Sequence, residues 1–287
     1  MIIEKPIFIL GSQRSGTTWL ARAFEQHPNV AYWHEPRYVW IWGNFKKPDD
    51  LLTAKDLNPK IKKHIIRKFS QFLHQQEKQR LCEKTPSNCL RISFIRAVFP
   101  DAKIILLLRD GRSVLRSTRQ SLVTQGGLGL NWTNVRRKIE KVPPGEWYLL
   151  LPRIGSFIKK LLGLKIQFAG VKPPGWQEWI GQTSANVLLA KQWATTIEIA
   201  VKEGRKLPTE NYLELRYEEL ISAPPELLKQ LANFVEIENF APISDYIDNT
   251  ADPPRAYQWK SELEQTTLDE IREIMEPTLV RLGYSWE

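Results

Sequence analysis

Short apolar runs alternate with longer amphipathic segments along the chain. Residues 6–10 are wholly apolar and end at Gly11, which is typical of a strand buried in a parallel sheet. Residues 17–26 then carry apolar side chains at helical spacing until His27-Pro28-Asn29 stops the pattern. Together the two segments predict a strand–loop–helix unit.

A second unit of this kind is clearer. Residues 103–108 form a near-continuous apolar strand, followed by Arg109-Asp110-Gly111 and a helix over residues 112–121. Because this strand is hydrophobic on both faces, helices should cover both sides of the sheet. Further helices are predicted at 60–76, 88–99, 185–203, 224–234 and 267–282, with strands starting at 30 and spanning 212–216. The alternation predicts an α/β fold with a central parallel sheet and a layer of helices on each face, three layers in all.

Residues 122–183 depart from this alternation and are rich in tryptophan and in Pro-Pro pairs. No Gly/Ser/Pro linker divides the chain, so we expect a single domain over residues 1–287. Within this domain, we expect the Trp/Pro-rich insertion at about 122–183 to lie over the sheet edge and to cover the active site. Its stretch 152–168 mixes apolar residues with lysines, which fits an acceptor-binding lid, a membrane-surface helix or an irregular structural cover; these lysines are Lys159, Lys160 and Lys165.

The chain is basic, with a net charge of +9 over 287 residues. This charge favours anionic ligands, but it does not separate nucleotides from nucleic acid, acidic sugars or membrane surfaces. The cysteines Cys82 and Cys89 are isolated from histidines, so a buried thiol is expected for each and zinc is not. The low cysteine count and the charged Glu4-Lys5 pair predict a cytoplasmic protein without a signal peptide, with any membrane contact peripheral.

The loop between the first strand and helix has the chemistry of an anion site. A glycine-rich turn that opens a helix presents free N–H groups and the positive end of the helix dipole. Ser15 and Gly16 let a phosphate approach the backbone, and Thr17 and Thr18 add hydroxyl donors. Thr17 stands where an NTP-hydrolysing P-loop has its lysine, and Arg14 is the cation of this loop. ATP hydrolysis is therefore disfavoured, and no metal is expected.

Three segments carry a family resemblance. The first, Arg14-Ser15-Gly16-Thr17-Thr18-Trp19, resembles the 5′-phosphosulfate loop of sulfotransferases that use 3′-phosphoadenosine 5′-phosphosulfate (PAPS). The second, from Leu108 to Ser117, is similar to their 3′-phosphate site, which implies that Arg109 and Ser117 bind that phosphate. More weakly, Leu215 to Leu220 is similar to a segment whose tyrosine, here Tyr217, lies near the adenine. The resemblance implies PAPS as the sulfuryl donor and a three-layer, P-loop-like α/β fold.

Sulfuryl transfer requires a base for the acceptor and cations where charge builds. His34 and Glu35 end a short predicted strand on opposite faces, so only one should point into the cleft. Many cytosolic family members use histidine. The spacing from Arg14 through His27-Pro28 to Glu35 is, however, similar to that in protein-tyrosine sulfotransferases, which favours Glu35 as the base and leaves His34 as the alternative.

Two further segments bear on charge stabilisation. Cys82-Glu83-Lys84-Thr85-Pro86 is similar to the Lys-Asp/Ser/Thr-Pro segment of tyrosine-protein and glycan sulfotransferases, which implies that Lys84 stabilises charge together with Arg14. A solvated surface lysine is the other interpretation. The chain lacks the Arg-Lys-Gly segment of cytosolic sulfotransferases, which leaves Arg255 or Lys260, in a basic aromatic loop, to close over the nucleotide.

The expected reaction is transfer of the sulfuryl group from PAPS to an acceptor hydroxyl or amine, releasing adenosine 3′,5′-bisphosphate. The candidate hydroxyl acceptors are glycan, lipid, phenol and peptide tyrosine, and nucleic acid is not an expected partner. The rival hypotheses are a P-loop kinase or NTPase and a basic membrane- or nucleic-acid-binding protein. Trp33, Trp40 and Trp42 suit either sugar stacking or core packing, and core packing is expected. The sequence does not indicate which acceptor is used or the oligomeric state.

Overall fold

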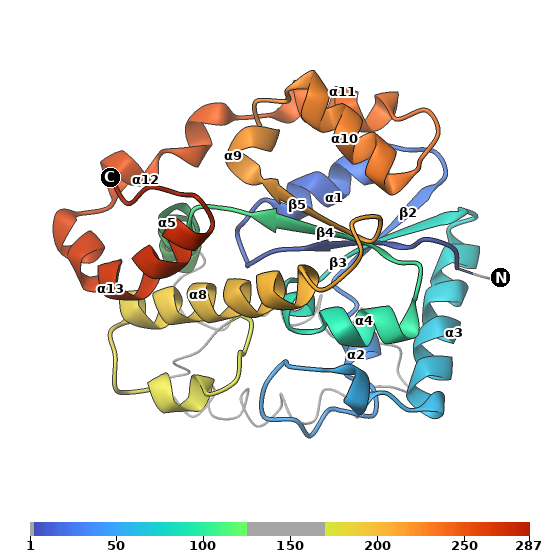
Figure 1. The fold of residues 1–287 in the computed structure, drawn as a ribbon, viewed down its shortest axis with the longest axis horizontal. Coiled ribbons are helices and arrows are strands. Elements are labelled where there is room, and N and C mark those ends of the chain that lie inside the picture. Colours follow the sequence, from blue (N-terminus) through green and yellow to red (C-terminus); the bar gives the residue numbers. More distant parts are fainter. Residues whose placement is uncertain (1–2, 125–169) are drawn as a thin grey trace.

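The centre of the computed structural model, which describes residues 3–124 and 170–287, is a parallel β-sheet (Figure 1). In this part of the chain the sheet has five strands in the order β2-β3-β1-β4-β5. All four strand pairings are parallel, so the carboxyl ends of the strands meet at one edge. The strands are β1 (Ile7–Leu10), β2 (Val30–His34), β3 (Arg80–Lys84), β4 (Lys103–Leu108) and β5 (Tyr212–Arg216). The predicted α/β class is confirmed.

Helices cover both faces of the sheet (Figure 1). On one face lie α1 (Thr17–Glu25), α9 (Tyr217–Leu220), α10 (Pro225–Val235) and α11 (Ala241–Thr250). On the other face lie α2 (Arg37–Trp40), α3 (Pro59–Gln75), α4 (Ile92–Val98), α5 (Gly111–Thr124) and α8 (Ala185–Gly204). Helix α12 (Trp259–Glu262) packs on α5, and α13 (Gln265–Arg281) packs on α5 and α8. Short 3-10 turns are η1 (Ala54–Asp56), η2 (Pro86–Leu90), η4 (Trp176–Trp179) and η5 (Pro253–Ala256).

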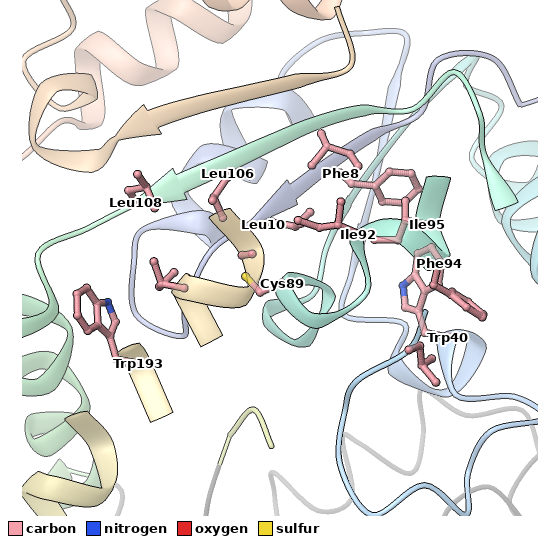
Figure 2. Close-up of a cluster of buried hydrophobic side chains, with 14 of the residues drawn as sticks. Phe8, Leu10, Trp40, Cys89, Ile92, Phe94, Ile95, Leu106, Leu108 and Trp193 are labelled. Carbon is pink, nitrogen blue, oxygen red and sulfur yellow. The ribbon is translucent and has the colours of Figure 1, made fainter. Parts of the chain in front are cut away.

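The strand side chains alternate between two hydrophobic cores. In β1, Ile7 and Ile9 pack with α1, α10 and α11, whereas Phe8 and Leu10 pack on the opposite face with α3, α4 and α8. Figure 2 shows the second of these cores. Each fully buried side chain of this size contributes about 1.5–3 kcal/mol through the hydrophobic effect. Burial on both faces explains why the strand sequences are continuously apolar.

One expectation about the elements was wrong, and one strand was not predicted. The helix predicted at 88–99 is split into η2 and α4 at Arg91, whose backbone leaves the helical conformation at φ −135°. The buried Arg91 guanidinium donates to Asp50 Oδ1 at 2.9 Å, a tertiary bond that this backbone break accommodates. Strand β3 was missed because Glu83 and Lys84 interrupt its apolar pattern.

Residues 125–169 of the predicted insertion, including the segment 152–168 and its lysines, lie outside the described residues. The chain returns through residues 170–172, here called the strap. Lys172 N–H donates to Asp50 Oδ2 at 2.9 Å, and Asp50 N–H donates to the Lys172 carbonyl oxygen at 2.8 Å. The strap is therefore fixed to the loop that follows α2. Within residues 3–124 and 170–287, every helix is too short or too polar to cross a membrane.

The three tryptophans near α3 pack as expected. Trp40 is fully buried in the core shown in Figure 2. Trp33 stacks on Phe72 with 4.3 Å between ring centroids, and Trp42 stacks on His64 at 4.2 Å. These rings hold α2 and α3 against the sheet, since α3 carries both partners.

Candidate functional site

The carboxyl edge of the sheet gathers the residues that the sequence singles out. Glu35 follows β2, Lys84 ends β3, Arg109 follows β4 and Tyr217 follows β5. The loop 11–16 follows β1, which lies at the centre of the strand order. The loop therefore lies between the strand of Lys84 and the strand of Arg109, and ligands of open α/β folds bind at this edge.

The loop after β1 is compact. The N–H and Oγ of Ser15 both donate to the carbonyl oxygen of Ser12, at 3.2 and 2.6 Å. Gly16 has φ +91°, and a Cβ there would lie 2.5 Å from the Tyr217 ring, so only glycine fits. Helix α1 begins at Thr17, whose N–H is among the first-turn donors left without a helical partner. The loop thus has the geometry of an anion site at a helix N-terminus.

Arg14 joins this loop to helix α5. Its Nε donates to Ser117 Oγ at 3.1 Å. Arg109 Nη1 donates to the Arg14 carbonyl oxygen at 2.9 Å, and Arg109 Nη2 donates to the Arg255 carbonyl oxygen at 3.0 Å. The two strand-to-helix turns that resemble phosphate sites are therefore in direct contact.

Both guanidinium groups lack an anionic partner in the described part of the chain, where they bond to hydroxyl and carbonyl oxygens. Desolvation lowers the pKa of Arg14, and the nearby Arg255 lowers it further. Desolvation likewise lowers the pKa of Arg109, whose Nε is buried without a hydrogen-bond partner among these residues. Cations held without a counter-ion are suited to bind an anion.

Two aromatic rings flank the loop. Tyr217 lies edge-on to Trp19, with 6.0 Å between ring centroids, and under the Arg109 guanidinium at 4.3 Å. Trp19 Nε1 donates to Thr250 Oγ1 at 2.8 Å, which ties the indole to α11. Rings held in this way next to an anion site can stack on a nucleobase.

An ion pair lies at the other end of the edge. The buried Lys84 Nζ donates to Glu35 Oε1 at 2.7 Å, and Arg37 Nη2 lies 3.0 Å from Glu35 Oε2. Burial by itself raises the pKa of Glu35, but Arg37 and Lys84 together lower it to about 2. Glu35 is therefore a carboxylate at neutral pH and is able to accept a proton.

His34 lies beside this pair. Its Nδ1 is 2.7 Å from Tyr32 Oη, and its Nε2 is 4.0 Å from Glu35 Oε1. The expectation that His34 and Glu35 point to opposite faces does not hold. Glu35 has φ +51°, so strand alternation ends at His34, and the Glu35 N–H donates to the Lys84 carbonyl oxygen at 3.0 Å.

Glu83 is a buried carboxyl group that sequence reasoning missed. Its oxygens accept from Asn88 Nδ2 at 2.8 Å, from Trp40 Nε1 at 3.3 Å and from Thr85 Oγ1. Burial raises its pKa to about 7. The signal available in the sequence was a carboxylate next to Lys84 in a segment flanked by apolar residues.

Arg37 was also missed, although a cation two residues after Glu35 was a usable signal. Of the two C-terminal candidates, Arg255 lies near the loop 11–16, because its carbonyl oxygen accepts from the Arg109 side chain that also bonds to Arg14. Lys260 instead lies over the Trp259 ring at 5.8 Å and lines a different cleft of about 540 Å³.

Cys82 and Cys89 are buried free thiols, as predicted. Among residues 3–124 and 170–287, no group of three or more His, Cys, Asp or Glu side chains is arranged to hold a metal ion.

A model of the sulfotransferase family matches residues 6–154. Protein-tyrosine sulfotransferase A of Caenorhabditis elegans is 30% identical over 135 residues, which is 44% of this chain and 36% of that protein. Human protein-tyrosine sulfotransferase 1 is 27% identical over 135 residues, and this alignment also covers 44% of this chain and 36% of the human protein. The matched region thus covers about a third of the length of these curated relatives.

Among solved structures, the sulfotransferase domain from the curacin biosynthetic pathway superposes with a TM-score of 0.57. The alignment covers 99% of both chains at 17% sequence identity. At this identity the likeness shows the shared fold.

Proposed function

Because the chain belongs to the sulfotransferase family, we propose that it transfers the sulfuryl group of PAPS to an acceptor hydroxyl or amine. The observation that carries the proposal is the contact between Arg14 and the Arg109–Ser117 turn, where two cations lack an anionic partner in the described chain. PAPS has a phosphosulfate at one end of its ribose and a phosphate at the other. Two adjoining cationic turns match that charge distribution.

The residue roles follow from this arrangement. Arg14, together with the loop residues Ser15, Gly16, Thr17 and Thr18, would bind the 5′-phosphosulfate. Arg109 and Ser117 would bind the 3′-phosphate, and the unpartnered Arg109 Nε offers a donor for it. Trp19 and Tyr217 would flank the adenine.

In the proposed reaction, Glu35 takes the proton of the acceptor hydroxyl as the acceptor oxygen forms its bond to sulfur. The bond between sulfur and the 5′-phosphate oxygen breaks, which releases a sulfate ester and adenosine 3′,5′-bisphosphate. Arg14 and Lys84 stabilise the charge that develops on the transferring group and the leaving oxygen. We keep His34 as the alternative base, since its Nε2 is 4.0 Å from Glu35.

The low pKa of Glu35 depends partly on Lys84, so the proposed reaction can change it. A carboxylate with a pKa of about 2 is a weak base, and Lys84 is one of the two cations that hold it there. When the Lys84 ammonium turns toward sulfuryl oxygens, Glu35 loses part of that stabilisation and its pKa rises. Glu35 would then become more basic as the donor is engaged.

The acceptor class is also a proposal. The names of the curated relatives favour peptide tyrosine among hydroxyl acceptors, with phenols, glycans and lipids as the other classes. We further propose that the chain is one domain whose insertion covers the acceptor side of this edge.

A transfer assay with labelled PAPS tests the proposal. Tyrosine peptides, phenols, glycans and lipids are offered in parallel, and label in one class identifies the acceptor. In a separate experiment, adenosine 3′,5′-bisphosphate should raise the melting temperature and Mg²⁺-ATP should not. Stabilisation by Mg²⁺-ATP without sulfate transfer would instead support a P-loop kinase or NTPase.

A further inference from the structure

A small cavity lies between helices α5 and α8 and the loop 11–16, which is called the donor loop from here on because it is proposed to bind PAPS. Ser12 and Gln13 of the loop, Val171 of the strap and residues of both helices line it. Its volume is about 10 Å³. This is close to the smallest space that holds a water molecule.

Three of the residues that line this cavity each carry a buried polar atom with no hydrogen-bond partner among the described residues. These atoms are Ser12 Oγ, Trp193 Nε1 and Thr196 Oγ1. All three residues are buried, with exposed fractions of 4%, 2% and 1%. Figure 2 shows the Trp193 indole near Leu108, at the carboxyl end of β4. Unsatisfied polar atoms are rare in protein interiors, so three around one cavity point to a common partner.

The chemistry of these atoms identifies that partner. The indole N–H can only donate, whereas each hydroxyl can donate or accept. One water molecule can accept from Trp193 and bond to both hydroxyl groups, and ordered buried waters typically make about three such bonds. A larger ligand does not fit the volume.

The surrounding contacts show what such a water would connect. Gln13 Nε2 donates to Gln192 Oε1 at 2.8 Å, and Gln192 Nε2 donates to the Val171 carbonyl oxygen at 2.6 Å. The donor loop is thus already joined to α8 and to the strap through Gln13. A water bonded to Ser12, Trp193 and Thr196 would add a second connection one residue earlier in the loop.

We propose that this cavity is a binding site for one ordered water molecule that fixes the donor loop to α8. The Ser12 carbonyl oxygen accepts both Ser15 bonds, so the position of Ser12 sets the position of the loop. The water thereby positions the N–H groups that bind the 5′ end of the donor. The site stands on the cavity alone, whereas its effect on donor binding rests on the proposed function.

Thr196→Val tests the proposal, since it removes the hydroxyl at nearly constant size. A high-resolution crystal structure of the wild type should show a water within hydrogen-bond distance of the three atoms, and the variant should lack it. The dissociation constant for adenosine 3′,5′-bisphosphate should rise about fivefold, the effect of one lost net hydrogen bond. The donor KM should rise equally with little change in kcat, and Thr196→Ser should restore both values.

Thr118→Val is the matched control. Thr118 lines the same cavity, but its Oγ1 donates to the Val114 carbonyl oxygen at 2.8 Å within α5. This variant should keep the water and the wild-type dissociation constant. Equal weakening by Thr118→Val and Thr196→Val, or a wild-type cavity without water density, would overturn the inference. Failure of the wild type to bind the bisphosphate would contradict the proposed function instead, and the diffraction result would then decide the water site by itself.

Discussion

The carboxyl edge of the sheet has two halves that differ in how their charged groups are paired. The donor half contains Arg14 and Arg109, and the other half contains Glu35 and Lys84. On the donor side, Arg14 and Arg109 bond to neutral oxygens, and no described carboxylate pairs with them. On the other side, the Glu35 carboxylate is held between Lys84 and Arg37. Uncompensated cations attract a polyanion, whereas a compensated carboxylate stays ionised until one of its cations moves. Under the proposed function, the first half binds the sulfuryl donor and the second half takes the proton of the acceptor.

The largest expected effect comes from removing a cation of the donor half. Arg14→Ala should abolish turnover, with a loss of at least about 10³-fold in kcat/KM, because Arg14 is proposed to contact both the phosphate and the transferring group. Labelled-PAPS transfer measures it. Arg22→Ala, an exposed arginine on α1, is the control and should retain full activity. Retention of most activity by Arg14→Ala would remove Arg14 from the mechanism.

Glu35→Gln should separate the two halves, because it should lower the rate of transfer without weakening donor binding. Loss of the base should lower kcat by about 10²-fold or more. The dissociation constant for adenosine 3′,5′-bisphosphate should stay near the wild-type value, because the donor half keeps its contacts. Stopped assays and calorimetry measure the two quantities separately.

His34→Ala is the companion variant. If Glu35 is the base, this change should lower kcat less than Glu35→Gln does. A larger loss from His34→Ala would reverse the assignment.

Tyr217→Leu should produce a smaller, binding-only effect. Losing a ring that stacks on a base should raise the bisphosphate dissociation constant by about tenfold. Tyr217→Phe keeps the ring and should bind like the wild type, and calorimetry compares the three proteins. Equal weakening by both variants would place the role of Tyr217 in its hydroxyl group instead.

The smallest expected effect is a shift in pH dependence. In the free protein Glu35 has a pKa of about 2, so it should contribute no acid limb to kcat/KM at pH 5–8. Arg37→Gln removes a cation, which raises this pKa, so the carboxyl group keeps its proton to higher pH. The acid limb of kcat/KM should therefore move upward in the variant. An acid limb that stays at the wild-type pH in Arg37→Gln, followed down to about pH 2, would argue against Glu35 as the base.

The fold and the donor half were largely predictable because their signals are local. The apolar runs of β1 and β4 are buried on both faces, so composition alone identifies them. The loop 11–16 likewise shows the chemistry of an anion site through adjacent residues. Strand β3 was not predictable from its pattern, because Glu83 and Lys84 replace apolar residues there.

In the half around Glu35, the sequence identified the residues but not their arrangement in space. Its geometry depends on the positive φ of Glu35 and on the pairing of β2 with β3, which places His34 beside Lys84. Neither feature produces a periodic pattern of polar and apolar residues that could be recognised in the sequence. The same holds for Arg37, whose contact with Glu35 arises from the turn between β2 and α2.

The strap belongs to both halves at once. Val171 is bonded through Gln192 to Gln13 of the donor loop. Lys172 is bonded through Asp50 to Arg91, whose Nη1 donates to Asn88 Oδ1 beside Glu83. Two consecutive residues thus carry hydrogen-bonded chains that end on opposite sides of the carboxyl edge of the sheet. A displacement of the strap would disturb the loop 11–16 and the surroundings of Glu83 together, so under the proposed function the strap would be a point of thermodynamic linkage between donor and acceptor binding.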